Sequence, residues 1–209
     1  MIGVEKKSTA QLQDARTVRK IVSIDDHIAM AFAGLTADAR VLIDLARVEG
    51  QSYKLNLDER VDAEHITKHI AGVQQQYTQS GGRRPFGIST LIAGFSPSGA
   101  PRLFQTDPSG NYAEWKANAI GRNAKTTREF LEKHYEEAEG AAAVKLVLRS
   151  LMETVEASGK TVEIAVMERG SPLTVLKDDE IEALVKEIEE EKAAAEAALR
   201  RRGGAAGSG

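Results

Sequence analysis

Cysteine is absent from this chain of 209 residues, which excludes disulfide bonds, thiolate zinc sites and a cysteine nucleophile. Long hydrophobic runs are absent too, since none approaches the ~20 residues that a membrane-spanning helix needs. The first residues, MIGVEKK, lack the apolar region of a secretory signal peptide. With 28 basic and 31 acidic residues, the net charge of −3 gives no reason to expect a nucleic-acid partner. These absences predict a protein of the cytoplasm and nucleus that binds neither membrane nor nucleic acid.

Charge and composition divide the chain into unequal parts. Acidic residues outnumber basic ones by nine to five within 178–202, and the last seven residues are GGAAGSG. Glycine and alanine at such an end have no side chains to pack. We therefore expect a packed domain over 1–188, a projecting acidic and Ala-rich helix over 189–202, and a disordered Gly-rich tail over 203–209.

The predicted strands and helices occur in groups along the chain, and single strands do not alternate with single helices. Apolar patterning predicts strands at 18–24 and 27–33, joined by a turn at Asp25-Asp26, and later strands at 87–95, 102–106, 112–119, 162–167 and 173–176. Helices are predicted to begin at Thr36, near Asp62 and at Asp178. Two more are predicted, one that begins with a capping box of Thr126 with Glu129 and one that ends at Ser158-Gly159. This order predicts an α+β fold, a sandwich with antiparallel sheets inside and helix pairs outside.

Apolar residues at helical spacing indicate which helix faces are buried. We expect four core stripes, made of Val41, Leu42, Leu45 and Val48; of Ile66, Ile70, Val73 and Tyr77; of Val144, Val147, Leu148, Leu151 and Val155; and of Ile181, Leu184, Val185 and Ile188.

Residues with catalytic or metal-binding chemistry are few. His65 and His69 have the i, i+4 spacing of zinc ligands, but no third ligand is near them in sequence, so a solvated helix face is the favoured interpretation. The segment 25–27 (DDH) is more typical of a hairpin turn than of an acid–base pair. The segment 81–84 (GGRR) lacks the Lys-Ser/Thr ending of a phosphate loop. These patterns predict no catalytic residue, no metal site and no cofactor.

Four separated motifs carry more information than composition does. They are 34–40 (GLTADAR); 76–79 (QYTQ) with 84–87 (RPFG); 106–110 (TDPSG); and 115–121 (WKANAIG). In this order and spacing they closely resemble the alpha subunits of the 20S proteasome. The segment 6–21, with KKS, LQD and RKI, is most similar to the type-four alpha subunit, and the Ala-rich acidic end is similar to plant and green-algal members.

The resemblance implies a four-layer sandwich of the N-terminal-nucleophile hydrolase type. It also implies a non-catalytic place in a seven-membered alpha ring, beside other alpha subunits and the catalytic beta rings, in ubiquitin-dependent protein degradation. Family members begin with a gate-forming tail, a helix and a strand that pairs with the strand containing Val4. Because this sequence starts part-way into that second strand, we expect an N-terminally truncated fold with an unpaired edge.

The resemblance further implies an activator-binding site. The lysine in its Arg-Lys-Ile context is Lys20, which is expected to receive the C-terminal carboxylate of a regulatory-particle ATPase tail between adjacent alpha subunits. Gly34 and Leu35 match the opposite pocket wall. The rival interpretation is an N-terminal threonine hydrolase of the beta type, which would need cleavage before Thr9 to free its amine as a base.

Overall fold

The computed structural model describes residues 1–6 and 19–205. The elements follow the predicted order of strands, two helices, strands, two helices, strands and one helix. They are β1 (Ile2–Glu5), β2 (Ile21–Asp25), β3 (Ile28–Gly34), α1 (Thr36–Leu57), α2 (Ala63–Gln79), β4 (Ile88–Phe95), β5 (Pro101–Thr106), β6 (Tyr112–Glu114), α3 (Ala124–His134), α4 (Gly140–Met152), β7 (Val162–Val166), β8 (Thr174–Val175) and α5 (Asp178–Ala205).

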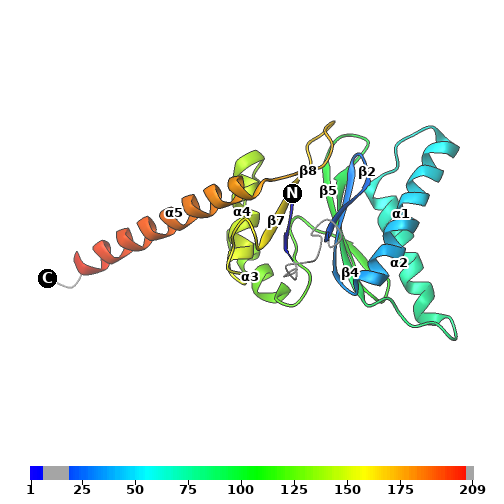
Figure 1. Ribbon diagram of the computed structural model, residues 1–209, viewed down its shortest axis with the longest axis horizontal. Coiled ribbons are helices and arrows are strands. Elements are labelled where there is room, and N and C mark those ends of the chain that lie inside the picture. Colours follow the sequence, from blue (N-terminus) through cyan, green and yellow to red (C-terminus); the bar gives the residue numbers. More distant parts are fainter. Residues whose placement is uncertain (7–18, 206–209) are drawn as a thin grey trace.

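Two antiparallel sheets form the inside of the molecule, and helices cover both outer faces (Figure 1). The larger sheet has the order β2-β3-β4-β5-β6 and is covered by α1 and α2. The smaller sheet has the order β1-β7-β8 and is covered by α4, which packs on α3 and α5. The predicted α+β four-layer sandwich is therefore confirmed.

The larger sheet is buried on both faces at its centre. Residues 28–32 of β3 are all buried, because one face meets α1 and α2 while the other meets the smaller sheet. In β4 the deepest side chains alternate, with Ile88, Thr90 and Ile92 almost fully buried. Thr90 lies opposite Thr106 on β5, and their hydroxyl oxygens are 2.7 Å apart in a buried hydrogen bond. This pair fixes the strand register without leaving a buried hydroxyl unsatisfied.

The core face of α1 differs from the predicted stripe. Leu42 is buried as expected, whereas Val41, Leu45 and Val48 are exposed. The prediction was wrong because alanine and glycine occupy much of the true core face and give a weak hydrophobic signal. Together with Leu42, that face consists of Ala39, Ile43, Ala46 and Gly50. The helix also begins after Leu35 instead of being capped by Thr36.

The second core lies between α4, β7 and α5. Leu148, Ile164, Ile181 and Ile188 are fully buried there, and Leu151 and Val155 are partly buried against them. The predicted stripes of α4 and α5 are therefore confirmed at their central positions. The capping box of Thr126 with Glu129 is not formed, because α3 already begins at Ala124 with Asn123 before it.

The projecting end of α5 extends away from the sandwich (Figure 1). The helix continues to Ala205, three residues past the boundary predicted at Arg202, since each added residue can still donate its N–H to the preceding turn.

Residues 206–209 of the predicted Gly-rich tail lie outside the described residues, as does Thr9. Among the described helices, none has the length and hydropathy that a membrane span requires.

Candidate binding pocket

Lys20 lies immediately before β2 and links the two sheets. Its Nζ donates a hydrogen bond to the backbone carbonyl of Glu5 at 2.7 Å. Glu5 is the last residue of β1, which pairs with β7 and, among the described residues, forms one edge of the smaller sheet. The ammonium is therefore held between the last residue of β1 and the first residue of β2.

Gly34 closes β3 in a conformation that requires glycine. Its φ is 129°, and a Cβ added there would lie 2.1 Å from the carbonyl oxygen of Gly87. The next residue, Leu35, donates its backbone N–H to that same oxygen at 3.0 Å. Leu35 is 53% exposed. A larger residue at position 34 would separate the end of β3 from the segment before β4.

Asp38 joins two of the sequence motifs that lie far apart in the chain. Its carboxylate accepts two hydrogen bonds from Arg84, both at 2.7 Å, and one from the backbone N–H of Gly87 at 2.9 Å. The hydrogen bonds from Arg84 lower the pKa of Asp38 and, together with Gly87, outweigh the opposing effect of burial. The same contact raises the pKa of Arg84. This clamp fixes the start of α1 and, with it, Gly34 and Leu35.

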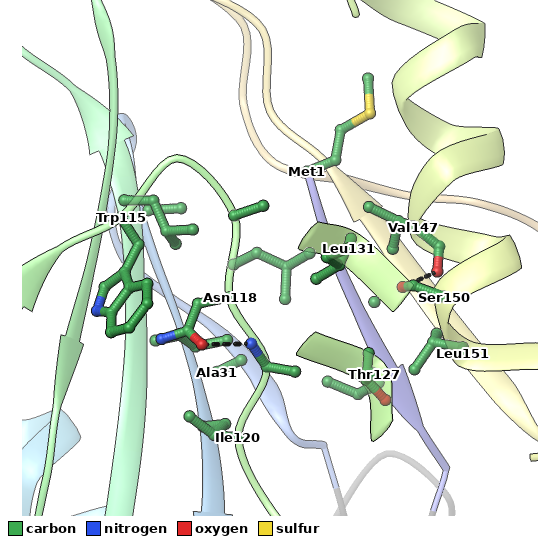
Figure 2. Close-up of a pocket in the computed structure, with 18 of the residues that line it drawn as sticks. Met1, Ala31, Trp115, Asn118, Ile120, Thr127, Leu131, Val147, Ser150 and Leu151 are labelled. Carbon is green, nitrogen blue, oxygen red and sulfur yellow. Dashed lines mark hydrogen bonds between the residues drawn. The ribbon is translucent and has the colours of Figure 1, made fainter. Parts of the chain in front are cut away.

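A cavity of about 1730 Å³ lies between the two sheets, α3 and α4. Lys20 and Gly34 both line it, whereas Leu35 does not. Figure 2 shows Ala31 of the larger sheet on one side, with Leu131 of α3 and Leu151 of α4 on the other. The structure therefore brings two of the three predicted site residues to one cavity and leaves Leu35 on the surface beside it.

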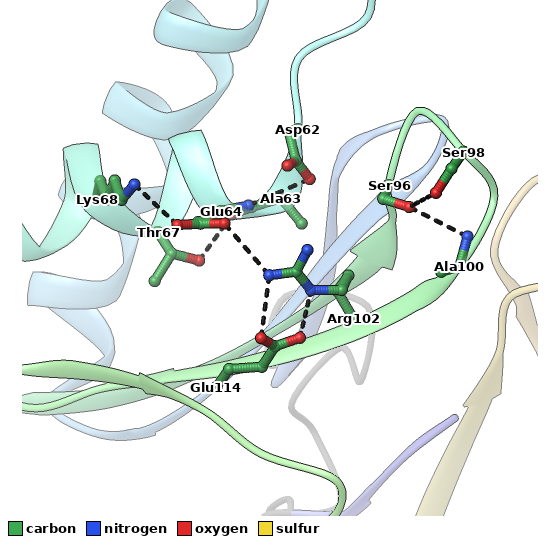
Figure 3. Close-up of polar contacts among 10 residues, drawn as sticks. All are labelled: Asp62, Ala63, Glu64, Thr67, Lys68, Ser96, Ser98, Ala100, Arg102 and Glu114. Atoms are coloured by element: carbon green, nitrogen blue, oxygen red, sulfur yellow. Dashed lines mark hydrogen bonds and ion pairs between the residues drawn. The ribbon is translucent and has the colours of Figure 1, made fainter.

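A polar cluster connects α2 with strands β5 and β6 of the larger sheet (Figure 3). Arg102 on β5 contacts Glu64 at 3.2 Å and Glu114 at 3.0 Å, and Lys68 contacts Glu64 at 2.8 Å. Hydrogen bonding from Lys68, assisted by Arg102, lowers the pKa of Glu64. The hydrogen bond to Glu114 raises the pKa of Arg102. The charges of this cluster are paired with one another and hold α2 to β5 and β6.

The other candidates from the sequence occupy structural positions. Asp25 accepts a hydrogen bond from the N–H of Asp26 at 2.8 Å in the β2–β3 turn, and His27 Nε2 contacts the carbonyl of Val61 at 2.6 Å. Gly82 has a φ of 78° in the turn after α2. These positions confirm the structural interpretations of both segments. His65 and His69 have a neighbour that sequence spacing could not reveal, Glu49 on α1.

Comparison with known proteins identifies the family. Residues 1–167 match the sequence model of the Proteasome family, described as "Proteasome subunit". "Proteasome subunit alpha type-7" of Cicer arietinum is 61% identical over 194 residues, which cover 92% of this chain and 78% of that protein. "Proteasome subunit alpha type-8" of Mus musculus is 59% identical over 195 residues, with the same coverage of both proteins.

These names confirm the alpha-subunit resemblance and revise its detail. They carry the types seven and eight, not the predicted type four, and the similar identities to plant and mouse proteins do not separate the two lineages. They support a non-catalytic alpha-ring subunit and not the beta-type threonine hydrolase. The chain belongs to the proteasome alpha-subunit family.

Proposed function

We propose that this alpha-ring subunit of the 20S proteasome receives the C-terminal tails of regulatory-particle ATPases at Lys20, with Gly34 and Leu35 contributing the surrounding surface. The observation that carries the proposal is the position of the Lys20 ammonium. It is held 2.7 Å from a backbone carbonyl at the wall of a cavity that Gly34 also lines.

The chemistry favours a terminal carboxylate as the ligand. Lys20 now donates to the neutral carbonyl oxygen of Glu5, and a charged carboxylate forms a shorter and stronger hydrogen bond with an ammonium. The exposed Leu35 side chain offers an apolar contact next to this charge. The Asp38–Arg84 clamp holds the backbone at Gly34 and Leu35, so little conformational entropy is lost when a tail binds.

The test measures tail binding to rings that contain this subunit. Peptides that end in a free carboxylate should lose about tenfold or more in affinity for this pocket when Lys20→Ala is introduced, because a hydrogen bond to a charged group contributes ~1.5–3 kcal/mol. Peptides with an amidated C-terminus should bind both rings equally weakly. The control is Lys125→Ala, which removes an exposed lysine of α3. Equal binding of the free-acid peptide by the Lys20→Ala and wild-type rings would refute the assignment.

We further propose the broader setting that the alpha-subunit family implies. The chain contacts neighbouring alpha subunits and the beta ring, the beta subunits carry the threonine protease activity, and the complex acts in cytoplasm and nucleus. The Ala-rich acidic helix is the feature that favours a plant or green-algal source. Imaging of the tagged subunit in cells, together with the native mass of the complex that it enters, tests the location and the assembly.

A further inference from the structure

Within the described residues, the outer edge of β1 has no neighbouring strand, because β1 pairs with β7 alone. Lys6, just past β1, donates its N–H to the carbonyl of Thr161 on the β7 side. Since the polar groups of successive residues point to opposite sides of a strand, those of Gly3 and Glu5 point away from β7. The outer edge therefore presents the N–H and carbonyl groups of both residues, and the Glu5 carbonyl accepts a hydrogen bond from Lys20.

A large cavity runs along this outer edge. Residues 1–6 line the cavity of about 1730 Å³ that lies between the two sheets, α3 and α4. Pockets that hold small molecules are smaller, at ~300–1,000 Å³. Figure 2 shows Ala31 of the larger sheet on one side of the cavity, with Leu131 of α3 and Leu151 of α4 on the other. The space next to β1 is therefore large enough for a peptide and has apolar side chains on both sides.

The two faces of β1 indicate what the side chains of an added strand would contact. Ile2 lies in a buried cluster with Ala29 and Ala31 of the larger sheet. On the other face of β1, a Cβ added at Gly3 would lie 2.6 Å from the Val147 side chain of α4. Because successive side chains of a strand point to opposite faces, a strand beside β1 would direct alternate side chains toward the larger sheet and toward α4. Both sets of contacts favour apolar residues.

We propose that the outer edge of β1 binds an extended peptide as an additional parallel strand, with the terminal carboxylate of the peptide at Lys20 and its apolar side chains in the cavity. The carboxylate contact rests on the proposed function, and the added strand describes how the rest of the tail is held. Addition of a peptide to an open sheet edge is a recurring mode of recognition, in which main-chain hydrogen bonds give affinity and pockets for alternate side chains give specificity.

The position of Lys20 sets the direction of the peptide. Its ammonium lies beside the carbonyl of Glu5, the last residue of β1, so a peptide that ends there runs parallel to β1. In a parallel pair, each outward-facing residue bonds the two residues that flank its neighbour on the other strand. The last residue of the peptide would then donate its N–H to the Glu5 carbonyl, and the third residue from the end would donate to the Gly3 carbonyl. The N–H of the residue between them would point away from β1.

The charged groups at this end of β1 favour the exchange. When Lys20 turns to the carboxylate it releases the Glu5 carbonyl, and the peptide N–H takes its place, so the carbonyl stays satisfied. Lys6 also lies near this end of β1, but its ammonium is bound to Asp178 at 2.9 Å and to the carbonyl of Gly159 at 2.6 Å. It therefore does not compete for the carboxylate, and charge complementarity favours Lys20.

The test measures peptide binding to the isolated full chain, because every contact of the proposed strand lies within one chain. The probe is a fluorescein-labelled peptide of apolar residues with a free C-terminal carboxylate, and the readout is fluorescence anisotropy. N-methylation of the last or of the third-last residue should weaken binding about fivefold or more, because each removes an N–H that a β1 carbonyl accepts. N-methylation of the residue between them adds the same bulk and is the matched control, which should bind as the unmodified peptide does.

Amide hydrogen exchange of the wild-type chain gives a second readout without modified peptides. Binding should slow the exchange of the Gly3 and Glu5 N–H groups, because peptide carbonyls then accept them. Val4 is the internal reference, since its N–H points toward β7 with or without the peptide.

The outcomes separate strand addition from the carboxylate contact. If all N-methylated peptides bind equally well while Lys20→Ala weakens binding, strand addition is overturned and the carboxylate contact stands. If N-methylation weakens binding while Lys20→Ala binds as the wild type does, the proposed function and the parallel direction are both overturned. A full chain without saturable peptide binding, or unchanged exchange at Gly3 and Glu5, would also overturn strand addition. Circular dichroism verifies that Lys20→Ala keeps the fold, which is expected because Lys20 is not buried.

Discussion

Two leucines of α1 offer a direct test of how this helix packs. Leu42 and Leu45 are three residues apart and belong to the same apolar stripe in the sequence, yet Leu42 is fully buried and Leu45 is 37% exposed. Leu42 lies in the core formed by the larger sheet, α1 and α2, with Ile66, Ile70 and Ile88 among its members. The comparison of Leu42→Ala with Leu45→Ala holds the residue type, the helix and the helix propensity constant.

The expected costs differ because only one site leaves a cavity. Replacing leucine by alanine removes three carbon atoms, and at ~0.8 kcal/mol for each buried methylene the transfer loss at Leu42 is about 2.4 kcal/mol. The cavity left behind adds to this loss, which brings the expected range to about 2–5 kcal/mol. At Leu45 solvent can replace the lost atoms, so the cost should stay below ~1 kcal/mol. The larger loss is a substantial part of the ~5–15 kcal/mol that stabilises a typical domain.

The assay is urea unfolding of the full chain, followed by circular dichroism, with all variants at the same protein concentration. The Leu42→Ala midpoint should fall well below that of Leu45→Ala, and the slopes should be unchanged. The surface variant Leu55→Ala on the same helix provides a second exposed reference. Equal losses for Leu42→Ala and Leu45→Ala would contradict the orientation of α1 described above.

Two further predictions concern the clamp and the C-terminal helix. Asp38→Ala removes the hydrogen bond from the Gly87 N–H and should cost about 1–2 kcal/mol in unfolding free energy at pH 7. Because the folded-state pKa of Asp38 is lowered, its contribution is complete above the ordinary pKa of ~3.9 and is lost as pH falls through the lower value. The difference between wild type and Asp38→Ala should therefore shrink below about pH 4 in urea unfolding, and a constant difference would argue against the clamp. Deleting 192–209 removes the exposed contact between Lys192 and Glu153, while the Glu191–Lys145 contact remains. The shortened chain should still enter a ring by native mass spectrometry, and exclusion from rings would show that this end is needed for assembly.

Local sequence signals determined the elements and their order. The turn at Asp25-Asp26, the start of α2 after Asp62 and the strand over 88–95 all appear where short-range patterns predicted them. These features depend on neighbouring residues, such as a carboxylate that accepts the N–H of Glu64 at 3.4 Å. The family motifs were visible for the same reason, since each is a short run whose spacing can be read directly from the chain.

Tertiary contacts decided which side chains face the core and which distant residues meet. The exposed side of α1 could not be predicted because Ala39, Ala46 and Gly50 bury well and yet add little to a hydrophobic pattern. Asp38 and Arg84 are 46 positions apart, and Glu49 is 16 positions from His65. No periodicity relates such pairs, since they meet only after α1 has packed on α2 and on the larger sheet. The motifs were therefore determined by the sequence alone, whereas the clamp and the contact of Glu49 with His65 depend on the packed fold.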